Sequence, residues 1–271
     1  MDRSTVDGSL LHGVASTALW TLYNRASEAA RPDGILRDPV AVDLMAAIDY
    51  PFRETFGEPD QSHPLRAVCF DDAVRDFLRE HPDGTVVALG EGLETGFWRT
   101  DNGRVRWISL DLPEVIELRE RLLPKHDRIR HVAGSVLDLS WINEVDTSRP
   151  VLVIAQGLLP YLQPADAIGL IQNCSYHFVG GRMIFDLVPP WHSRRAQQGR
   201  RLATGYTVPP VPFSMTAAQA SRLANWLPRV ASVELLRPPA GRGWRRRFVA
   251  AVGRLPVLRD HRFVICLLRF A

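Results

Sequence analysis

The fold of this chain is decided by the stretch Thr85-Val86-Val87-Ala88-Leu89-Gly90-Glu91-Gly92-Leu93-Glu94-Thr95. A short apolar run bounded by turn residues is typical of a strand buried on both faces, as in a parallel sheet. The two glycines that follow lack the Cβ atoms that would keep a ligand away from the backbone. We expect a helix from Leu93, whose first N–H groups would add positive potential beside that turn.

A second strand, expected at residues 105–111, ends in a carboxylate, Asp111. An acidic residue about 20 positions after the first glycine can accept hydrogen bonds from ribose hydroxyls. A dinucleotide turn would need a third glycine at position 95, where this chain has threonine, and Glu94 would repel a pyrophosphate. S-adenosylmethionine, which has a ribose and no phosphate, therefore fits better than a nicotinamide dinucleotide. The alternative is an α/β domain whose glycines only form a tight turn.

Strands and helices alternate through the middle of the chain. The expected strands are 85–90, 105–111, 129–133, 150–155, 181–187, near 230–236 and 262–269. The expected helices between the first five strands are near 93–99, 113–123, 140–145 and 164–178. This alternation predicts an α/β fold with a doubly wound, mostly parallel, seven-stranded Rossmann-like sheet.

Segments on either side of this alternation predict a cap and a lid. Helical patterns over 11–30, from Pro39 to about residue 50, and over 64–80, with a loop between them, predict an N-terminal helical cap of residues 1–84. The core would then be residues 85–271. Prolines, arginine pairs and aromatic residues over 188–215 predict an irregular lid insertion that ends, after a helix at 216–227, near residue 230.

Composition narrows the classes of protein and partner. The chain has 271 residues, a hydrophobic content of 46% and a net charge of +3. It shows no secretory leader and no 18-residue apolar run, so we expect a cytoplasmic protein without a membrane partner. Its three cysteines lack the spacing of a zinc site or a disulfide framework, so no metal is expected. The oligomeric state is left open.

Arginines gather in two clusters. They are Arg194, Arg195, Arg200 and Arg201 in the first cluster, and Arg242, Arg245, Arg246 and Arg247 in the second. Such clusters form either a solvated surface or a site for an anionic small molecule. No nucleic-acid motif or interleaved aromatic pattern accompanies them, so a nucleic-acid partner is not expected.

Several motifs together resemble the leucine carboxyl methyltransferase family, in particular its bacterial O-methyltransferases of polyketide-type metabolism. The matching pieces are Leu36-Arg37-Asp38-Pro39, Arg66 with Phe70-Asp71, residues 87–95, Asp111-Leu112-Pro113-Glu114-Val115, Asp138-Leu139 and Gln156-Gly157-Leu158-Leu159-Pro160-Tyr161-Leu162. They follow the family's order from about residue 17 to residue 190. The resemblance implies a methyltransferase fold, S-adenosylmethionine as cofactor and a small-molecule acceptor.

The resemblance also implies where the cofactor lies. Gly90, with Glu91 and Gly92 beside it, would lie under the methionine part. Asp111, followed by Leu112, would hold the ribose.

Four further residues complete the implied cofactor site. Asp138 and Leu139 fall in the segment that meets adenine, and Arg66 would reach the methionine carboxylate. Gln156 stands where the family usually has an acid facing the cofactor's ammonium group, so either affinity falls or a neighbour supplies the charge. The alternatives are local: Arg66 would pair with an acid on its own helix, and Asp138 would cap the next helix.

The acceptor site is expected at Tyr161 and in the lid, at Trp191, Arg194 and Arg195. No catalytic base is evident, which suits a carboxylate acceptor because it is already ionised at neutral pH. We therefore expect methylation of a carboxylate, or of a hydroxyl, on an acceptor that would be anionic. Two alternatives remain: a methyltransferase-like binding protein without turnover, and a nicotinamide-dependent oxidoreductase.

Overall fold

The computed structural model describes residues 5–243 and 255–271. Its centre is a seven-stranded sheet in the order β5-β4-β3-β6-β7-β9-β8, where β9 is antiparallel to both neighbours and the other pairs are parallel. The strands are β3 (Thr85–Leu89), β4 (Arg106–Asp111), β5 (Ile129–Ala133), β6 (Val151–Ala155), β7 (Arg182–Leu187), β8 (Val230–Leu236) and β9 (Val264–Phe270). The predicted mostly parallel sheet is confirmed.

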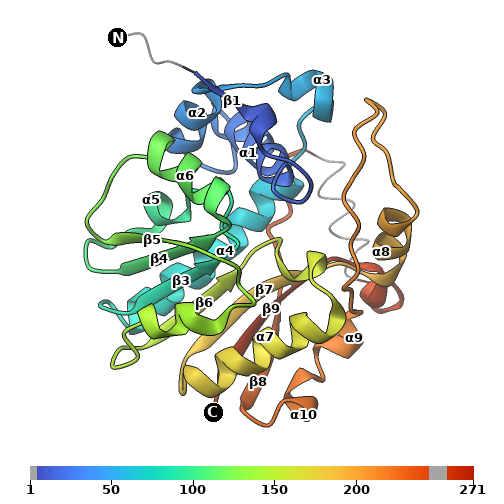
Figure 1. The fold of residues 1–271 in the computed structure, drawn as a ribbon. Helices are drawn as coiled ribbons and strands as arrows, with labels where there is room; N and C mark the ends of the chain where they lie inside the picture. Colours follow the sequence, from blue (N-terminus) through green and yellow to red (C-terminus); the bar gives the residue numbers. More distant parts are fainter. Residues whose placement is uncertain (1–4, 244–254) are drawn as a thin grey trace.

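Helices cover both faces of the sheet. They are α4 (Ser62–Glu80), α5 (Gly96–Thr100), α6 (Pro113–Leu122), α7 (Pro164–His177) and the 3-10 helix η2 (Leu139–Glu144). Alternate residues of β3 point to opposite sides: Val87 packs with α7 and η2, whereas Val86 packs with α4 and α5. Figure 1 shows α4 and α7 on opposite sides of the strands. The sheet is therefore doubly wound, as predicted.

The chain before β3 is mostly helical. Its elements are β1 (Val6–Asp7), η1 (Gly8–Leu10), α1 (Thr17–Ala29), α2 (Pro39–Ala46), β2 (Ile48–Asp49) and α3 (Phe52–Phe56). As expected from Asp38-Pro39, the Asp38 side chain caps α2 by accepting from the Ala41 N–H at 3.0 Å. The prediction of a loop over residues 51–63 was wrong, because α3 lies there. Phe52 and Phe56 of this helix are buried against aromatic side chains.

The segment after β7 corrects the expectation of an irregular insertion. It contains helix α8 (Pro190–Gln197), followed by a hairpin over residues 200–208 with an antiparallel bridge from Arg201 to Thr207. Prolines 189 and 190 suggested a break, but proline is favourable in the first turn of a helix because its missing N–H has no partner there anyway. The predicted helix at 216–227 is two short ones, α9 (Ala217–Ala220) and α10 (Leu223–Trp226).

The hairpin reaches the helical N-terminal part (Figure 1, orange segment rising from α8). Thr204 Oγ1 donates to the Thr55 carbonyl at 2.6 Å, and the Tyr206 and Ser16 hydroxyls lie 3.1 Å apart. The remaining short helices are η3 (Leu159–Tyr161) and η4 (Pro256–His261). None of the helices described is long and apolar enough to cross a bilayer. Arg245, Arg246 and Arg247 lie outside the described residues.

Candidate functional site

A cavity of about 710 Å³ lies at the carboxyl ends of the central strands. From β3 the chain continues to β4 and β5 on one side of the sheet. It then returns to β6, on the other side of β3, and continues outward to β7. This reversal of strand order is where α/β sheets bind ligands. The volume lies within the range of small-molecule sites.

The glycine turn after β3 brings backbone into the cavity wall. Gly90 and Gly92 have φ values of +58° and +57°, a region that side chains with a Cβ rarely adopt. A Cβ on Gly90 would lie 2.8 Å from Leu158 Cδ1. The expected helix start at Leu93 was wrong, because α5 begins only at Gly96. Buried arginines bind the carbonyl groups that an earlier start would use: Arg25 Nη2 donates to the Leu93 carbonyl at 2.7 Å.

Asp111 at the end of β4 holds this turn. Its Oδ2 accepts from the Gly92 N–H at 2.6 Å, and its Oδ1 accepts from the Leu112 N–H at 2.7 Å. Burial raises the pKa of Asp111, and the two backbone N–H groups oppose that rise. Each carboxylate oxygen keeps a lone pair for a further donor. Asp111 and Leu112 both line the cavity.

The Glu91 side chain points into the core. Its Oε1 accepts from Trp107 Nε1 at 3.0 Å, and its Oε2 lies 2.8 Å from Arg119 Nη2. Glu91 is therefore placed at the cavity wall by its position in the turn, while its carboxylate is committed to buried partners.

The two residues expected beside adenine do not line the cavity. Asp138 is exposed and caps η2, with Oδ1 accepting from the Ser140 N–H at 3.1 Å, and Leu139 packs against the core on the α7 side. Neither residue is among those that line the cavity; Gly134 and the following residues to Leu137, just after β5, are. Asp138 lies next to the start of η2, so its carboxylate caps that helix. The sequence does not show which part of the loop after β5 faces the cavity, whereas the fold does.

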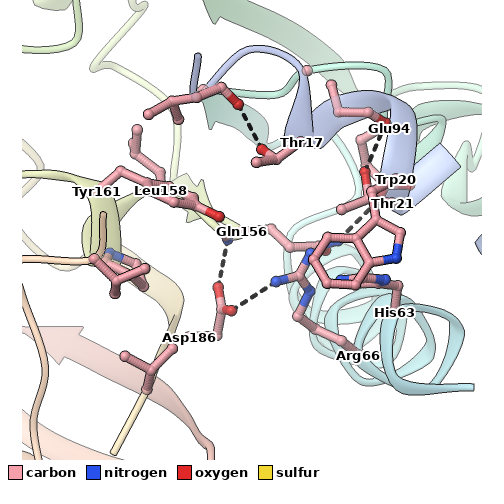
Figure 2. A pocket seen from close by; sticks show the side chains of 18 of the residues that line it. Thr17, Trp20, Thr21, His63, Arg66, Glu94, Gln156, Leu158, Tyr161 and Asp186 are labelled. Atoms are coloured by element: carbon pink, nitrogen blue, oxygen red, sulfur yellow. Dashed lines mark hydrogen bonds and ion pairs between the residues drawn. The ribbon is translucent and has the colours of Figure 1, made fainter. Parts of the chain in front are cut away.

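Arg66 forms an ion pair that the sequence did not suggest. Its Nη1 lies 2.9 Å from Asp186 Oδ2, whose second oxygen accepts from the Gly157 N–H at 2.5 Å. Figure 2 shows the Arg66 and Asp186 side chains, which both line the cavity, pointing toward one another. Asp186 is a site residue that sequence reasoning missed; the available signal was a carboxylate near the carboxyl end of β7.

Gln156, at the end of β6, is bonded to Glu94. Gln156 Nε2 donates to Glu94 Oε2 at 2.9 Å, and both residues line the cavity. Glu94 Oε1 is 3.0 Å from Arg25 Nη1 and 2.7 Å from Arg99 Nη1. Burial alone would raise the pKa of Glu94, but the two guanidinium groups hold it at about 2. A negative charge therefore lies directly behind Gln156.

The arginines behind Gln156 belong to a buried network. Asp38 Oδ2 is 3.0 Å from Arg25 and 2.7 Å from Arg99, and Asp71 makes a two-pronged contact with Arg99 at 2.7 and 2.9 Å. With Glu94, three carboxylates surround two guanidinium groups. Asp71 also lies 3.8 Å from Arg75, so the charges of the network balance, and Glu94 is its member at the cavity.

His63 lines the cavity one turn before Arg66 on α4. The distance from its Nδ1 to Asn24 Nδ2 is 2.6 Å, and the Asn24 carbonyl oxygen accepts from the Asp60 N–H at 3.1 Å. Figure 2 shows His63 beside Trp20, with which it makes an edge contact at 5.4 Å between ring centroids. Burial, together with the charge of Arg66, lowers the pKa of His63 to about 3, so its ring is neutral at physiological pH.

His192 and Arg200 line the cavity from α8 and the hairpin. Arg200 Nη1 lies 2.9 Å from His192 Nε2. Since a guanidinium group only donates, this nitrogen accepts and the neutral ring carries its proton on Nδ1. Burial and Arg200 lower the pKa of His192.

Of the four residues expected to contact the acceptor, three do not line the cavity. Arg194 and Arg195 are exposed on α8 and, like Trp191, are not among the cavity-lining residues. Trp191 Nε1 donates instead to the His261 carbonyl at 2.9 Å. Tyr161 does line the cavity, and burial raises its pKa. The cation that α8 and the hairpin bring to the cavity is therefore Arg200.

Known proteins resemble this chain in sequence. The family model described as leucine carboxyl methyltransferase matches residues 18–175. The tetracenomycin polyketide synthesis O-methyltransferase TcmP of Streptomyces glaucescens is 39% identical over 201 residues, which cover 73% of this chain and 74% of TcmP. The S-adenosyl-L-methionine-dependent methyltransferase dpfgK of Gibberella zeae is 31% identical over 211 residues, covering 69% and 70%.

Solved structures share the fold. A DUF574 family protein from Streptomyces avermitilis superposes with a TM-score of 0.54 at 16% identity, covering 93% of this chain and 96% of its own. A Thermobifida fusca protein named as a candidate methyltransferase gives 0.52 at 17% identity, covering 91% and 94%. At these identities the likeness concerns the fold alone.

Proposed function

Because the chain belongs to the leucine carboxyl methyltransferase family, whose relatives use S-adenosylmethionine, we propose that this methyltransferase acts on a carboxylate oxygen of a small anionic acceptor. The product would be a methyl ester. A hydroxyl oxygen is the second candidate, since the name of TcmP says only that it methylates oxygen.

The residues around the cavity suit this cofactor. The turn at Gly90 offers bare backbone, and Asp111 keeps lone pairs that ribose hydroxyls can use. The Gln156 carbonyl, with the Glu94 charge behind it, suits an ammonium group, and Arg66 retains donors for a carboxylate beyond the one it gives to Asp186. When bound, the cofactor supplies an electrophilic methyl group on a positively charged sulfur.

Glu94 is relevant to whether the protein is an active enzyme or only binds its ligands. Gln156 lacks the charge that the family usually places there, and this favoured a binding protein without activity. The Glu94 carboxylate lies 2.9 Å from that amide and stays ionised. A neighbour can therefore supply the missing charge, which supports an active enzyme.

The observation that carries the choice of acceptor is the state of the two cavity histidines. His63 Nδ1 faces an amide N–H of Asn24, and His192 Nε2 faces Arg200. Each ring therefore uses its lone pair on a protein donor and has no second one to accept a proton. Neither histidine can therefore act as the base that methylation of a phenol or an amine normally needs, whereas a carboxylate acceptor needs none.

The test uses an acceptor that carries both groups. 4-Hydroxybenzoate and related aromatic hydroxy acids are incubated with the full chain and S-adenosylmethionine, with excess S-adenosylhomocysteine as the inhibited control. The proposal expects products that mild alkali hydrolyses back to the acid, which identifies esters. Alkali-stable ethers as the main products would contradict it.

A further inference from the structure

We propose that His63 binds the acceptor's carboxylate through its Nε2–H, and that Asn24 is the positioning residue that fixes this tautomer. The inference rests on the proposed function, because it names the contact that recognises the carboxylate of that acceptor. It gives a specific role to a histidine that no sequence motif singled out.

The orientation of Asn24 is set from its far side. The backbone N–H of Asp60 donates to Asn24 Oδ1 at 3.1 Å, so this side-chain atom must be the carbonyl oxygen. The other atom, Nδ2, is then an NH₂ group and donates to His63 Nδ1 at 2.6 Å. Asn24 is 1% exposed, so water has little access to compete for these bonds.

The proton on His63 follows from this chain of bonds. Since Nδ1 accepts from Asn24, the neutral ring must carry its hydrogen on Nε2. Within the described residues, the hydrogen bond of the His63 ring is the one at Nδ1. Because Asn24 covers the Nδ1 side, the Nε2 edge is the polar part of the ring left for the cavity.

The charges around His63 keep the ring in this form. Arg66 and Arg25 disfavour a second proton, while Asp60 and Glu94 oppose them more weakly. Burial is the largest cause of the lowered pKa, and the arginines add to it, so the ring remains a neutral donor through the physiological range.

The surroundings of His63 suit the reacting carboxylate. His63 and Arg66 are three residues apart on α4 and share a face of that helix, so the donor lies beside the residue assigned to the cofactor's methionine end. Trp20 presents an apolar wall next to the ring, which favours an aromatic or apolar acid.

The bond to Nε2–H engages one lone pair of the carboxylate and leaves the others free. In the transfer, an O–CH₃ bond forms while the S–CH₃ bond breaks with its electron pair left on sulfur. No proton moves, so a histidine that only donates is sufficient.

The first experiment determines the tautomer without any acceptor. Long-range ¹H–¹⁵N correlation spectra are recorded on the ¹⁵N-histidine-labelled full chain with S-adenosylhomocysteine, between pH 5.5 and 8. The His63 signals are identified by their loss in His63→Gln. We expect a protonated Nε2 and a bare Nδ1 throughout, and a mixture of tautomers in Asn24→Ala. A proton on Nδ1 in the unaltered chain would overturn the proposal.

The second experiment measures benzoate binding by calorimetry to the chain saturated with S-adenosylhomocysteine. His63→Phe should weaken benzoate at least about tenfold, which is about 1.4 kcal/mol. His63→Gln should stay within about threefold, because its amide N–H can replace Nε2–H. Affinity for S-adenosylhomocysteine should not change in either variant.

Two results would overturn the proposal here. Equal benzoate behaviour of the unaltered chain and His63→Phe, including no binding by either, removes the contact. A loss of S-adenosylhomocysteine affinity in His63→Phe would place the donor in the cofactor site instead. Failure of the proposed function itself would show separately, as ether products from the hydroxy acids.

Discussion

Gln156 Nε2 donates to Glu94 Oε2 at 2.9 Å, and this bond leaves the Gln156 carbonyl oxygen as the acceptor that the amide can offer to the cavity. An ionised carboxylate cannot donate, so the orientation of the amide is fixed by the charge of Glu94. In the family, one acid at this position would supply both a hydrogen-bond acceptor and a negative charge. Here Gln156 supplies the acceptor and Glu94 supplies the charge.

Restoring an acid at position 156 should therefore weaken the cofactor. Gln156→Glu would set two carboxylates in contact, where like charges cannot both stay ionised without cost. We expect affinity for S-adenosylhomocysteine to fall about threefold to tenfold by calorimetry, up to about 1.4 kcal/mol. Gln172→Glu, on the exposed side of α7, is the matched control and should bind normally. Tighter binding by Gln156→Glu would show that the Glu94 charge does not serve the cofactor.

Asp111 and Asp138 should behave differently when each is replaced by alanine. Asp111→Ala removes the acceptors proposed for the ribose and the acceptor of the Gly92 N–H, so S-adenosylhomocysteine should bind about 1.5–3 kcal/mol more weakly. Asp138→Ala removes a helix cap outside the cavity and should cost about 1 kcal/mol of stability, with cofactor affinity unchanged. Calorimetry and urea unfolding separate the two effects. Equal affinity losses would return Asp138 to the cofactor site.

Arg200, rather than its neighbours on α8, should select the anionic acceptor. Arg200→Ala should lower kcat/KM for an accepted hydroxy acid about tenfold, or about 1.4 kcal/mol of transition-state stabilisation. The double variant of Arg194→Ala and Arg195→Ala should stay within about 0.5 kcal/mol, the usual range for surface changes. A loss confined to the double variant would favour the exposed arginines.

His63 should make stability fall as the solution is acidified. Its pKa is lowered from 6.5 to about 3 in the folded chain, so below pH 6.5 the unfolded chain binds a proton that the folded chain refuses. This contribution is fully present above pH 6.5 and is lost progressively as pH falls toward 3. His63→Gln should show a shallower decline of the free energy of unfolding between pH 6.5 and 4.5. Parallel curves would mean that His63 titrates normally.

The buried ion network should be expensive to break. Asp38→Ala leaves Arg25 and Arg99 short of a partner and removes the cap of α2, so it should cost about 3–5 kcal/mol in urea unfolding. Asp33→Ala, which removes the ion pairs of an exposed carboxylate with Arg31 and Arg242, should cost about 1 kcal/mol or less. Similar costs for both would mean that the buried charges are compensated by water.

The sheet was predictable because its signals are local. Each central strand is an apolar run closed by glycine, proline or a carboxylate, and β3 and β6 are buried along their whole length. Helix α8 was missed because prolines usually interrupt helices, although Pro190 occupies a first-turn position where it does not. The helical periodicity of α8 also determines where its arginines point. Ser193 and Ala196 are buried, so the two arginines between them face solvent.

The site was only partly predictable because half of it depends on contacts across the chain. Gly90 and Asp111 follow their strands directly, and sequence spacing alone placed them at the sheet edge. The pair of Arg66 and Asp186 joins residues 120 positions apart. The state of His63 likewise depends on Asn24, which is 39 positions away and looks in sequence like an ordinary helix residue.

The network of Arg25, Asp38, Glu94 and Arg99 joins the helical N-terminal part to the turn after β3. A chain shortened to begin at Thr85 would keep Glu94 and Arg99 but lose Arg25 and Asp38, and would uncover the apolar residues of α6 that pack beneath α1. We therefore expect the cap and the core to unfold together, since buried charges on each side of the boundary depend on partners on the other side. The wall of the cavity at Glu94 would then take its shape only when both parts are present.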